Sequence, residues 1–258
     1  MGLFSCGNTK NYLKDFGYGT IALPREGIKP LLMLAKRGDR LSPLGPVAST
    51  FLPGASPLPT AARSAAAAIS GSKSKSVDAK IGISLLGKVI GALAGSSLGL
   101  DVAYKNAKKV QFEFGDVTQE AIDITALDQY LSNGSVAPGT GNFIKQALED
   151  DDVYVIVATL DARQISVAAS GENSASVSVD VPVIQQIVGA KVAVSSGGSS
   201  SSKVTYTSTT TPLSFGLKVV RLVFKNGKYT TLKPEGGVGS EAVEASSAGF
   251  GPDVPTEI

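Results

Sequence analysis

Apolar and polar residues alternate along much of the second half of the chain. Residues 110–114 alternate with a period of two, as do most of the residues from 163 to 224, which is the pattern of strands with one buried and one wet face. Residues 153–158, VYVIVA, are apolar at every position and predict a central strand that is covered on both faces. These patterns predict an α+β fold with a twisted, mostly antiparallel central sheet and surrounding helices.

Helical signals are shorter and lie between the strands. They predict helices at residues 8–18, 125–133, 142–149 and 182–188. In the second of these, Thr125 and Asp128 stand at capping-box spacing. Residues 41–60 contain five prolines, so no regular element is predicted there.

Residues 76–114 satisfy two patterns that exclude each other. Residues 77–85 alternate as a strand, and residues 98–105 alternate again on the return, so the two could form a hairpin. Between them, four apolar residues share one helical stripe: Leu86, Val89, Ile90 and Leu93. Both interpretations stay open at this point.

The hairpin interpretation is compatible with a membrane. A transmembrane helix fits poorly, because Lys88 and five glycines interrupt residues 81–100, whereas a transmembrane strand needs only about 9 to 11 alternating residues. The side chains that would face lipid are Ile81, Ile83, Leu85, Leu98, Leu100 and Val102. The alternative is an ordinary soluble hairpin whose apolar face packs on the core, which is the commoner use of such a pattern.

The composition narrows the possible chemistry. The 258-residue chain has no histidine, which excludes His-based acid–base catalysis, Ser-His-Asp triads and His-ligated metals. Its single cysteine, Cys6, can form neither an internal disulfide nor a cysteine-built metal site. Carboxylate-pair, Ser-Lys and phosphate-cradle chemistry stay open, but each needs positive evidence of its own, and that evidence is weak. We expect a protein that is not an enzyme and that binds no metal or cofactor.

Other motifs are weak. Residues 82–88, GISLLGK, match the start of a P-loop, but Val89 replaces the Ser or Thr that would hold magnesium. The acidic run at 149–152 is more typical of a solvated loop than of a calcium site or a glycosidase pair. Basic residues are not interleaved with aromatic ones as on a nucleic-acid surface. No nucleic-acid partner is predicted.

Charge is divided unevenly along the chain. All 24 Lys and Arg residues lie at or before Lys233, so residues 1–234 carry +7, while residues 235–258 carry five acidic side chains and no basic one. The tail could simply aid solubility. It could also be a removable mask, since its loss would favour binding to an anionic surface such as phospholipid headgroups.

The first ten residues, MGLFSCGNTK, lack the basic start and long apolar run of a secretory peptide. The myristoylation pattern requires Ser or Thr at the position of Cys6. Attachment of a fatty acid to the Cys6 thiol fits the chemistry better, and the alternative is an incidental thiol in a frayed terminus.

Several strings resemble the bacterial gasdermins. They are NYLKDFGYGTIALPREGIKPLLML, KKVQFEF, VYVIVATL, VDVPVIQQIVGAKVAV and VTYTSTTTPLSFGLKVV. The resemblance extends from the first residue to about residue 224 and lies in the order and extent of the strings, since none is a catalytic signature. It implies the fold of a gasdermin N-terminal pore-forming domain, residues 1–234, followed by a short autoinhibitory peptide, residues 235–258.

The resemblance also implies a function. Such a protein is cytoplasmic until a protease, encoded alongside it, removes the C-terminal peptide. The core then inserts into the inner membrane and oligomerises into a large β-barrel pore that kills the cell in antiphage defence. Expected partners are that protease, anionic lipids and further copies of the chain. Palmitate on Cys6 would aid insertion. The rival hypothesis is a soluble, non-enzymatic β-rich binding or structural protein with an acidic solubilising tail.

The implied roles fall on particular residues. Membrane hairpins are expected at about 76–114 and 163–224. The inhibitory tail would contact the core through Val238, Val243, Phe250, Val254 and Ile258. Cleavage is expected in a glycine-rich linker at 225–240, with candidate positions at Lys228, Lys233, Gly236 and Gly239.

Overall fold

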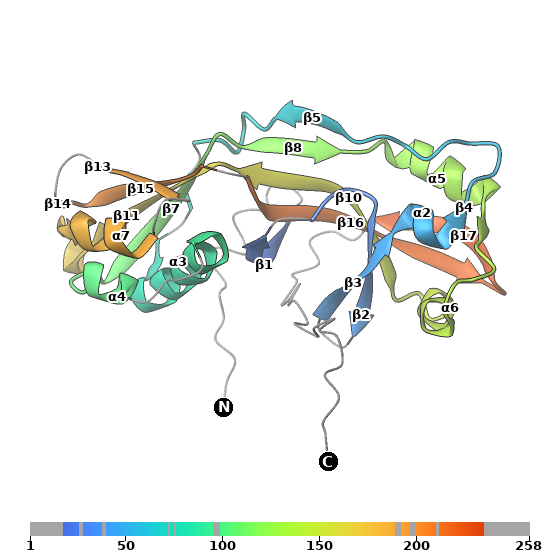
Figure 1. Cartoon of the computed structure of the whole chain (residues 1–258), viewed down its shortest axis with the longest axis horizontal. Helices are drawn as coiled ribbons and strands as arrows, with labels where there is room; N and C mark the ends of the chain where they lie inside the picture. The colour runs from blue at the N-terminus through green and yellow to red at the C-terminus, as the bar shows by residue number, and fades with distance from the viewer. Residues whose placement is uncertain are drawn as a thin grey trace, which may run out of the picture.

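The computed structural model describes residues 18–234, apart from residues 26–27, 38–39, 72, 75, 95–98, 189–191, 197–199 and 210–211. Within that part of the chain, a larger and a smaller β-sheet follow one another along the long axis of the molecule (Figure 1). Each sheet has its own helices. The predicted α+β fold dominated by antiparallel strands is therefore confirmed.

The larger sheet has the strand order β1-β16-β10-β2-β3, and β17, β8 and β5 pair at its sides. Its strands are β1 (Gly19–Arg25), β2 (Leu32–Arg37), β3 (Arg40–Pro46), β5 (Ala62–Ala65), β8 (Thr118–Ala121), β10 (Val153–Ala162), β16 (Leu213–Lys225) and β17 (Lys228–Pro234). All ten residues of β10 are buried, so the prediction of a central strand covered on both faces is confirmed.

The smaller sheet has the order β13-β15-β11-β7-β6. Its strands are β6 (Val77–Asp78), β7 (Lys109–Gly115), β11 (Gln164–Ser170), β13 (Val192–Ser196) and β15 (Lys203–Ser208). Two further pairs stand apart: β4 (Phe51–Leu52) with β9 (Ser135–Val136), and β12 (Val179–Asp180) with β14 (Ser200–Ser201).

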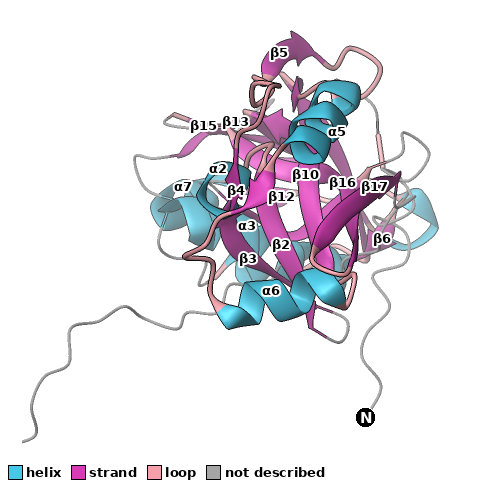
Figure 2. Cartoon of the chain, turned by 90° about the vertical axis from the view of Figure 1, so that its right-hand side faces the viewer, coloured by secondary structure: helices cyan, strands magenta, loops and turns pink. Residues whose placement is uncertain are grey.

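The helices divide between the two ends of the molecule. At the smaller sheet lie α3 (Ala79–Ala94), α4 (Leu100–Ala103), the short 3-10 turn η1 (Glu172–Ser174) and α7 (Val181–Val188). At the larger sheet lie α2 (Val47–Thr50), α5 (Ile124–Asn133) and α6 (Asn142–Glu149), with α5 against β17 and α6 against β16 (Figure 2). None of the helices described is both long and apolar enough to cross a bilayer.

Two strands run from one sheet into the other. A single residue, Arg163, separates β10 from β11, and Asp116 and Val117 separate β7 from β8. Asp116 adopts a positive φ of 52°, which turns the chain locally at the boundary. The sheets are thus connected by continuous backbone. They also share one buried cluster, in which Phe114 of β7 stacks on Phe215 of β16 with ring centroids 4.3 Å apart.

Three predicted helices are found close to their expected positions. The helix at 142–149 matches α6, the helix at 125–133 matches α5, and the helix at 182–188 matches α7. The α5 cap differs from the prediction, because Asp123 rather than Thr125 accepts the backbone N–H groups of Thr125 and Ala126. Most of the segment predicted as a helix at 8–18 lies outside the described residues.

The prediction for residues 41–60 was wrong in its first half. Pro43 and Pro46 lie in β3, which is the last strand on its side of the larger sheet. Proline lacks a donor but is tolerated at a sheet edge, and the register of β2 and β3 shifts between Met33 and Leu34. The short helix α2 and strand β4 follow before the chain becomes irregular.

Of the two interpretations left open for residues 76–114, the structure has the helix. Of residues 77–85, only Val77 and Asp78 form a strand and the rest belong to α3, and α4 lies in the return segment. Within 163–224, the alternating residues 177–181 predicted a strand, but only Val179 and Asp180 form one, β12, before α7 begins. In each case a helix covers the apolar face of the sheet, where a longer strand would have left that face exposed to water.

The linker predicted at 225–240 is not a linker in its first part. Asn226 and Gly227, with φ of 53° and 73°, form a tight turn, and β17 then pairs with β16 as far as Pro234. Glu149 accepts the backbone N–H of Gly227 at 2.6 Å, and Asp151 accepts that of Phe224 at 3.1 Å. Two residues of the acidic run at 149–152 therefore bind this hairpin by hydrogen bonds. The prediction of a solvated loop did not include that role.

Candidate functional site

The smaller sheet has one apolar and one polar face. Cross-strand pairing aligns its side chains in rows, because opposite residues point to the same face of a sheet. One apolar row runs Val194, Tyr206, Ile165 and Phe114, and the next runs Val204, Val167 and Phe112. The four residues that β15 and β11 contribute to these rows are all buried.

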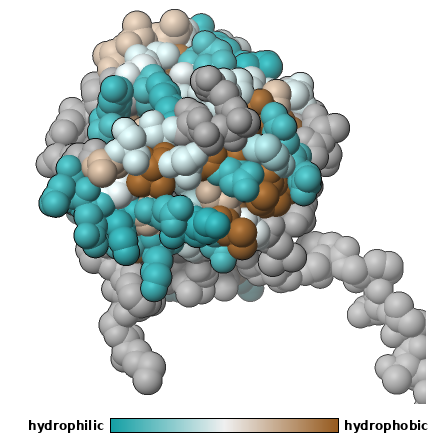
Figure 3. Space-filling view, turned by 90° about the vertical axis from the view of Figure 1, so that its left-hand side faces the viewer, coloured by the Kyte–Doolittle hydropathy of each residue, from teal (hydrophilic) through white to brown (hydrophobic). Residues whose placement is uncertain are grey.

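Helices cover this apolar face. Leu86 and Ile90 of α3, Leu100 of α4, and Ile184 and Val188 of α7 are each at most 1% exposed and belong to the same buried cluster as the strand residues. The predicted helical stripe therefore exists, at least for Leu86 and Ile90. The outer surface of this end mixes small apolar patches with polar residues (Figure 3).

The opposite face of the sheet is polar. Its rows contain Glu113, Ser166 and Thr205, which lie opposite one another in β7, β11 and β15. The Ser166 and Thr205 hydroxyls are 2.7 Å apart, and Lys203 forms an ion pair of 2.9 Å with Glu113. The strands of the smaller sheet are thus amphipathic, and the helices cover their apolar side.

Close backbone contacts fit the helices to the sheet. A Cβ atom added at Gly82 of α3 would lie 2.1 Å from Cγ2 of Val110 and 3.0 Å from Cγ2 of Val77. At Gly99, which precedes α4 with φ of 93°, an added Cβ would lie 3.3 Å from Ile187 of α7. Only glycine at position 82 lets α3 approach β7 this closely.

One buried polar contact joins the cover to the sheet. The hydroxyl of Tyr104, at the C-terminal cap of α4, lies 2.8 Å from the hydroxyl of Tyr206 in β15. Tyr104 is 1% and Tyr206 2% exposed. Burial raises the pKa of both tyrosines, and for Tyr206 the neighbouring Tyr104 raises the pKa further. Both hydroxyls therefore keep their protons at neutral pH.

The residues predicted to face lipid occupy different environments in the structure. Ile81 and Ile83 of α3 are half-buried, Leu100 is buried, and Val102 of α4 is 56% exposed. Leu85 lies in α3, and Leu98 lies outside the described residues. Four of the six positions thus have known surroundings, and only Val102 presents its side chain to water.

The predicted cleavage positions fall into two groups. Lys228 and Lys233 are exposed but belong to β17, whose Tyr229 donates a hydrogen bond to Asp128 of α5 and packs against Phe224. Gly236 and Gly239 lie outside the described residues, as do Cys6 and the predicted tail contacts Val238, Val243, Phe250, Val254 and Ile258.

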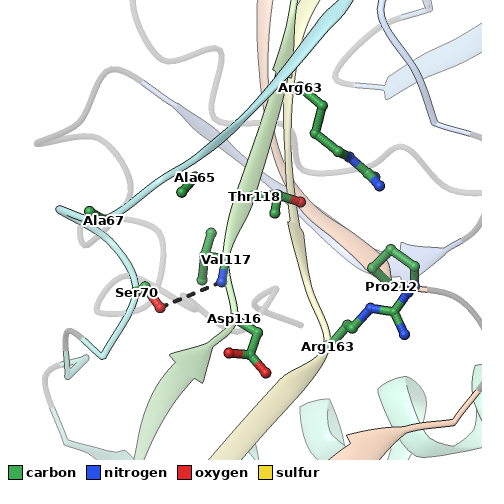
Figure 4. A pocket seen from close by; sticks show the side chains of 9 residues that line it. All are labelled: Arg63, Ala65, Ala67, Ser70, Asp116, Val117, Thr118, Arg163 and Pro212. Atoms are coloured by element: carbon green, nitrogen blue, oxygen red, sulfur yellow. Dashed lines mark hydrogen bonds between the residues drawn. The ribbon is translucent and has the colours of Figure 1, made fainter.

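A cleft of about 580 Å³ opens where the two sheets meet (Figure 4). Arg63, Arg163 and Pro212 lie along one wall, and Ala67 and Ser70 lie along the other. Arg63 forms an ion pair of 3.0 Å with the carboxylate of Asp161, which is 5% exposed and also accepts a 2.6 Å hydrogen bond from Ser214. This network fastens β5 and β16 to the centre of the larger sheet.

Sequence reasoning missed three features of this region. The Tyr104–Tyr206 contact and the Arg63–Asp161 pair each join residues about a hundred positions apart, so no local pattern reveals them. The close approach at Gly82 left a weak signal, because a glycine inside a regular pattern often marks a near backbone. Within the described residues no group of three side chains could hold a metal ion.

Comparison with known proteins agrees with this arrangement. A family model described as the Bacterial Gasdermin Family matches residues 21–228. The protein named Gasdermin bGSDM from a Desulfuromonadales bacterium is 39% identical over 236 residues, which cover 90% of this chain and 88% of the relative. The protein of the same name from Lysobacter enzymogenes is 36% identical over 244 residues, covering 93% and 89%.

The fold is shared with a solved structure. The structure of a bacterial gasdermin from Bradyrhizobium tropiciagri superposes with a TM-score of 0.66 at 16% identity, covering 90% of this chain and 95% of that one. The family model alone matches well over half of the chain. The chain therefore belongs to the bacterial gasdermins, a family of pore-forming proteins.

Proposed function

We propose that this chain is stored in the closed form described above and becomes a pore when a protease removes its C-terminal segment. The core then binds the inner membrane, and residues 76–114 and 163–224 refold into two β-hairpins. Many copies assemble into a β-barrel pore, because strand edges in hydrocarbon must be paired. The loss of the membrane barrier kills the cell, and we place this role in antiphage defence.

One observation carries the proposal. Residues 79–85 form a helix in the closed form, yet their sequence also alternates with the period of a strand. These residues can therefore be part of α3, which buries Leu86 and Ile90 on the sheet, and could turn Ile81 and Ile83 to lipid as a strand in a membrane. A chain selected only for the closed form would have no need of the second pattern.

The charge distribution supports the proposed switch. Residues 1–234 carry +7 and residues 235–258 carry five acidic side chains, so cleavage releases negative charge from a basic core and strengthens attraction to anionic lipids. A palmitoyl group on Cys6 would add a hydrophobic anchor, and one chain alone gives only reversible binding. The charge and the anchor would thus act together.

The position of β17 refines the proposed cleavage site. A protease binds its substrate as an extended, unpaired segment, whereas Lys228 and Lys233 are held in a paired strand. Cleavage there would require β17 to leave β16 and Tyr229 to leave Asp128. We therefore place the cut after Pro234, in the region of Gly236 and Gly239.

Dye release from vesicles tests the proposed function. Protein ending at Pro234, which keeps all of β17, should empty vesicles that contain phosphatidylglycerol, and the full-length chain should not. Neutral phosphatidylcholine vesicles serve as the control and should leak less, because the attraction to the basic core is absent. Equal inertness of both proteins on anionic vesicles would reject the proposal and favour a soluble binding protein.

A further inference from the structure

We infer that the Tyr104–Tyr206 hydrogen bond is a second closing contact, which lies within the pore-forming body itself and holds the first predicted hairpin segment onto the second. The inference rests on the proposed function for its consequence in membranes. Its structural part, the hydrogen bond that holds α4 on the sheet, can be tested in solution.

The two tyrosines come from the two segments that are proposed to form membrane hairpins. Tyr104 belongs to residues 76–114 and caps α4, whereas Tyr206 belongs to residues 163–224 and lies in the middle of β15. Their hydroxyls meet at 2.8 Å inside the cluster that also contains Leu100, Ile165 and Val204. The contact is thus a polar link across an otherwise apolar interface.

The link can exist only while α4 is folded. Tyr206 is already in a strand and keeps its place when β15 becomes part of a membrane hairpin, but α4 must unwind before residues 98–105 can extend. As soon as Tyr104 moves away, the hydroxyl of Tyr206 loses this partner inside an apolar core, which is the costly condition for a buried polar group. The bond therefore opposes the first step of opening.

Unlike apolar packing, a hydrogen bond fixes the position of α4 on the sheet. The contacts of Leu86, Ile90 and Leu100 with the sheet are non-directional, so a helix can shift while keeping much of its buried area. The hydroxyl pair is directional and holds only at one position of α4. Because burial raises the pKa of both tyrosines, the pair stays protonated throughout the neutral range.

Hydrogen exchange of the full-length protein, without membranes, tests the inference directly. Tyr104→Phe and Tyr206→Phe should each speed exchange of the α3 and α4 backbone amides about ten-fold. The double variant should show no more than one single effect, since both changes remove the same bond. The double variant leaves no buried hydroxyl without a partner, because both hydroxyls are removed. It therefore serves as the test if a single variant folds poorly.

Tyr130→Phe is the matched control. Tyr130 is 2% exposed and donates a 2.8 Å hydrogen bond to the carbonyl of Phe51, but it lies in the core of the larger sheet. The control removes the same kind of bond from a part of the molecule that need not open. It should leave exchange in α3 and α4 unchanged.

Dye release then connects the contact to activation. Protein ending at Pro234 should release dye about ten-fold faster with Tyr104→Phe than without it, and Tyr130→Phe should leave the rate unchanged. Exchange and release rates that are equal in Tyr104→Phe and Tyr130→Phe would overturn the inference while leaving the proposed function intact. Faster exchange in a truncated protein that never leaks would support the contact and reject the proposed function.

Discussion

Val102→Asp is expected to abolish dye release by the truncated protein while leaving the closed form as stable as the unchanged protein. Val102 is 56% exposed in α4, so a carboxylate there stays in water and surface substitutions of this kind change stability little. In the proposed hairpin the same residue faces lipid, where a charge near the midplane costs on the order of 1–2 kcal/mol or more. Every protomer of the pore would bear that cost.

Ser84→Asp is the matched control for this prediction. Ser84 is also exposed in the closed form, and it falls on the polar face of the proposed hairpin, so the added charge would meet the wet lumen. Dye release should be retained in Ser84→Asp, and urea unfolding should give both variants the stability of the parent. Normal leakage from Val102→Asp would show that the hairpin is placed wrongly. Leu100 is less suitable, because it is 1% exposed and a charge there would also disrupt the closed form.

Gly82→Ala is expected to open the closed form and make the protein leak faster after cleavage. Its new Cβ would stand 2.1 Å from Cγ2 of Val110, and a valine side chain cannot easily turn away. Overpacking of this kind costs about 1–3 kcal/mol, which exceeds the gain of about 1 kcal/mol from replacing glycine in a helix. Helix α3 must move off β7, and dye release should begin about ten times sooner.

The control for this change is Gly139→Ala. An added Cβ at Gly139 has no neighbour within 4 Å, so stability and the onset of release should stay unchanged. If Gly82→Ala delays release, α3 contributes to the membrane form in a way that close packing on β7 does not explain. Unaltered release would show that the separation of α3 from β7 does not limit opening.

The strands predicted most accurately are those whose sequence pattern is compatible with only one kind of element. The wholly apolar run of β10 and the alternation of β7, β11 and β15 each fit a single role in the sheet, and all were found. Residues 77–85 fit two roles. Local pattern could not decide between them, because the helix is selected by its packing on β7, which comes later in the chain.

Two other misses had signals that were available. Asn226 and Gly227 form an Asn-Gly pair directly after an apolar run, which is a sequence signal for a hairpin turn, and the structure has β17 at that place. The prolines of β3 hid a strand because proline excludes a central position but not an edge. Whether an element is central or at an edge follows from the tertiary fold and not from the local sequence.

The candidate site was predictable only as a region. The alternating segments located the smaller sheet, but the contact of Tyr104 with Tyr206 spans 102 residues. Gly82 shows its importance only when Val110 is seen beside it. Long-range packing therefore determines which residues join α3 and α4 to the smaller sheet.

In the proposed pore, residues of α4 change from helix to membrane strand. The reactivity of single cysteines at two neighbouring positions, placed in separate variants, measures this change. Cys6 is the only cysteine, so Cys6→Ala gives a background in which Val102→Cys and Ala103→Cys can be probed one at a time. In the closed form residue 102 is exposed and Ala103 is 2% exposed. A water-soluble thiol reagent should therefore modify position 102 and spare position 103.

On anionic vesicles, after truncation at Pro234, the two reactivities should exchange. Position 102 should become protected by lipid, and position 103 should become reactive in the wet lumen, because neighbouring residues of a strand point to opposite faces. If position 102 stays reactive and position 103 stays protected on vesicles that have leaked, α4 has not become a membrane strand and the account is contradicted.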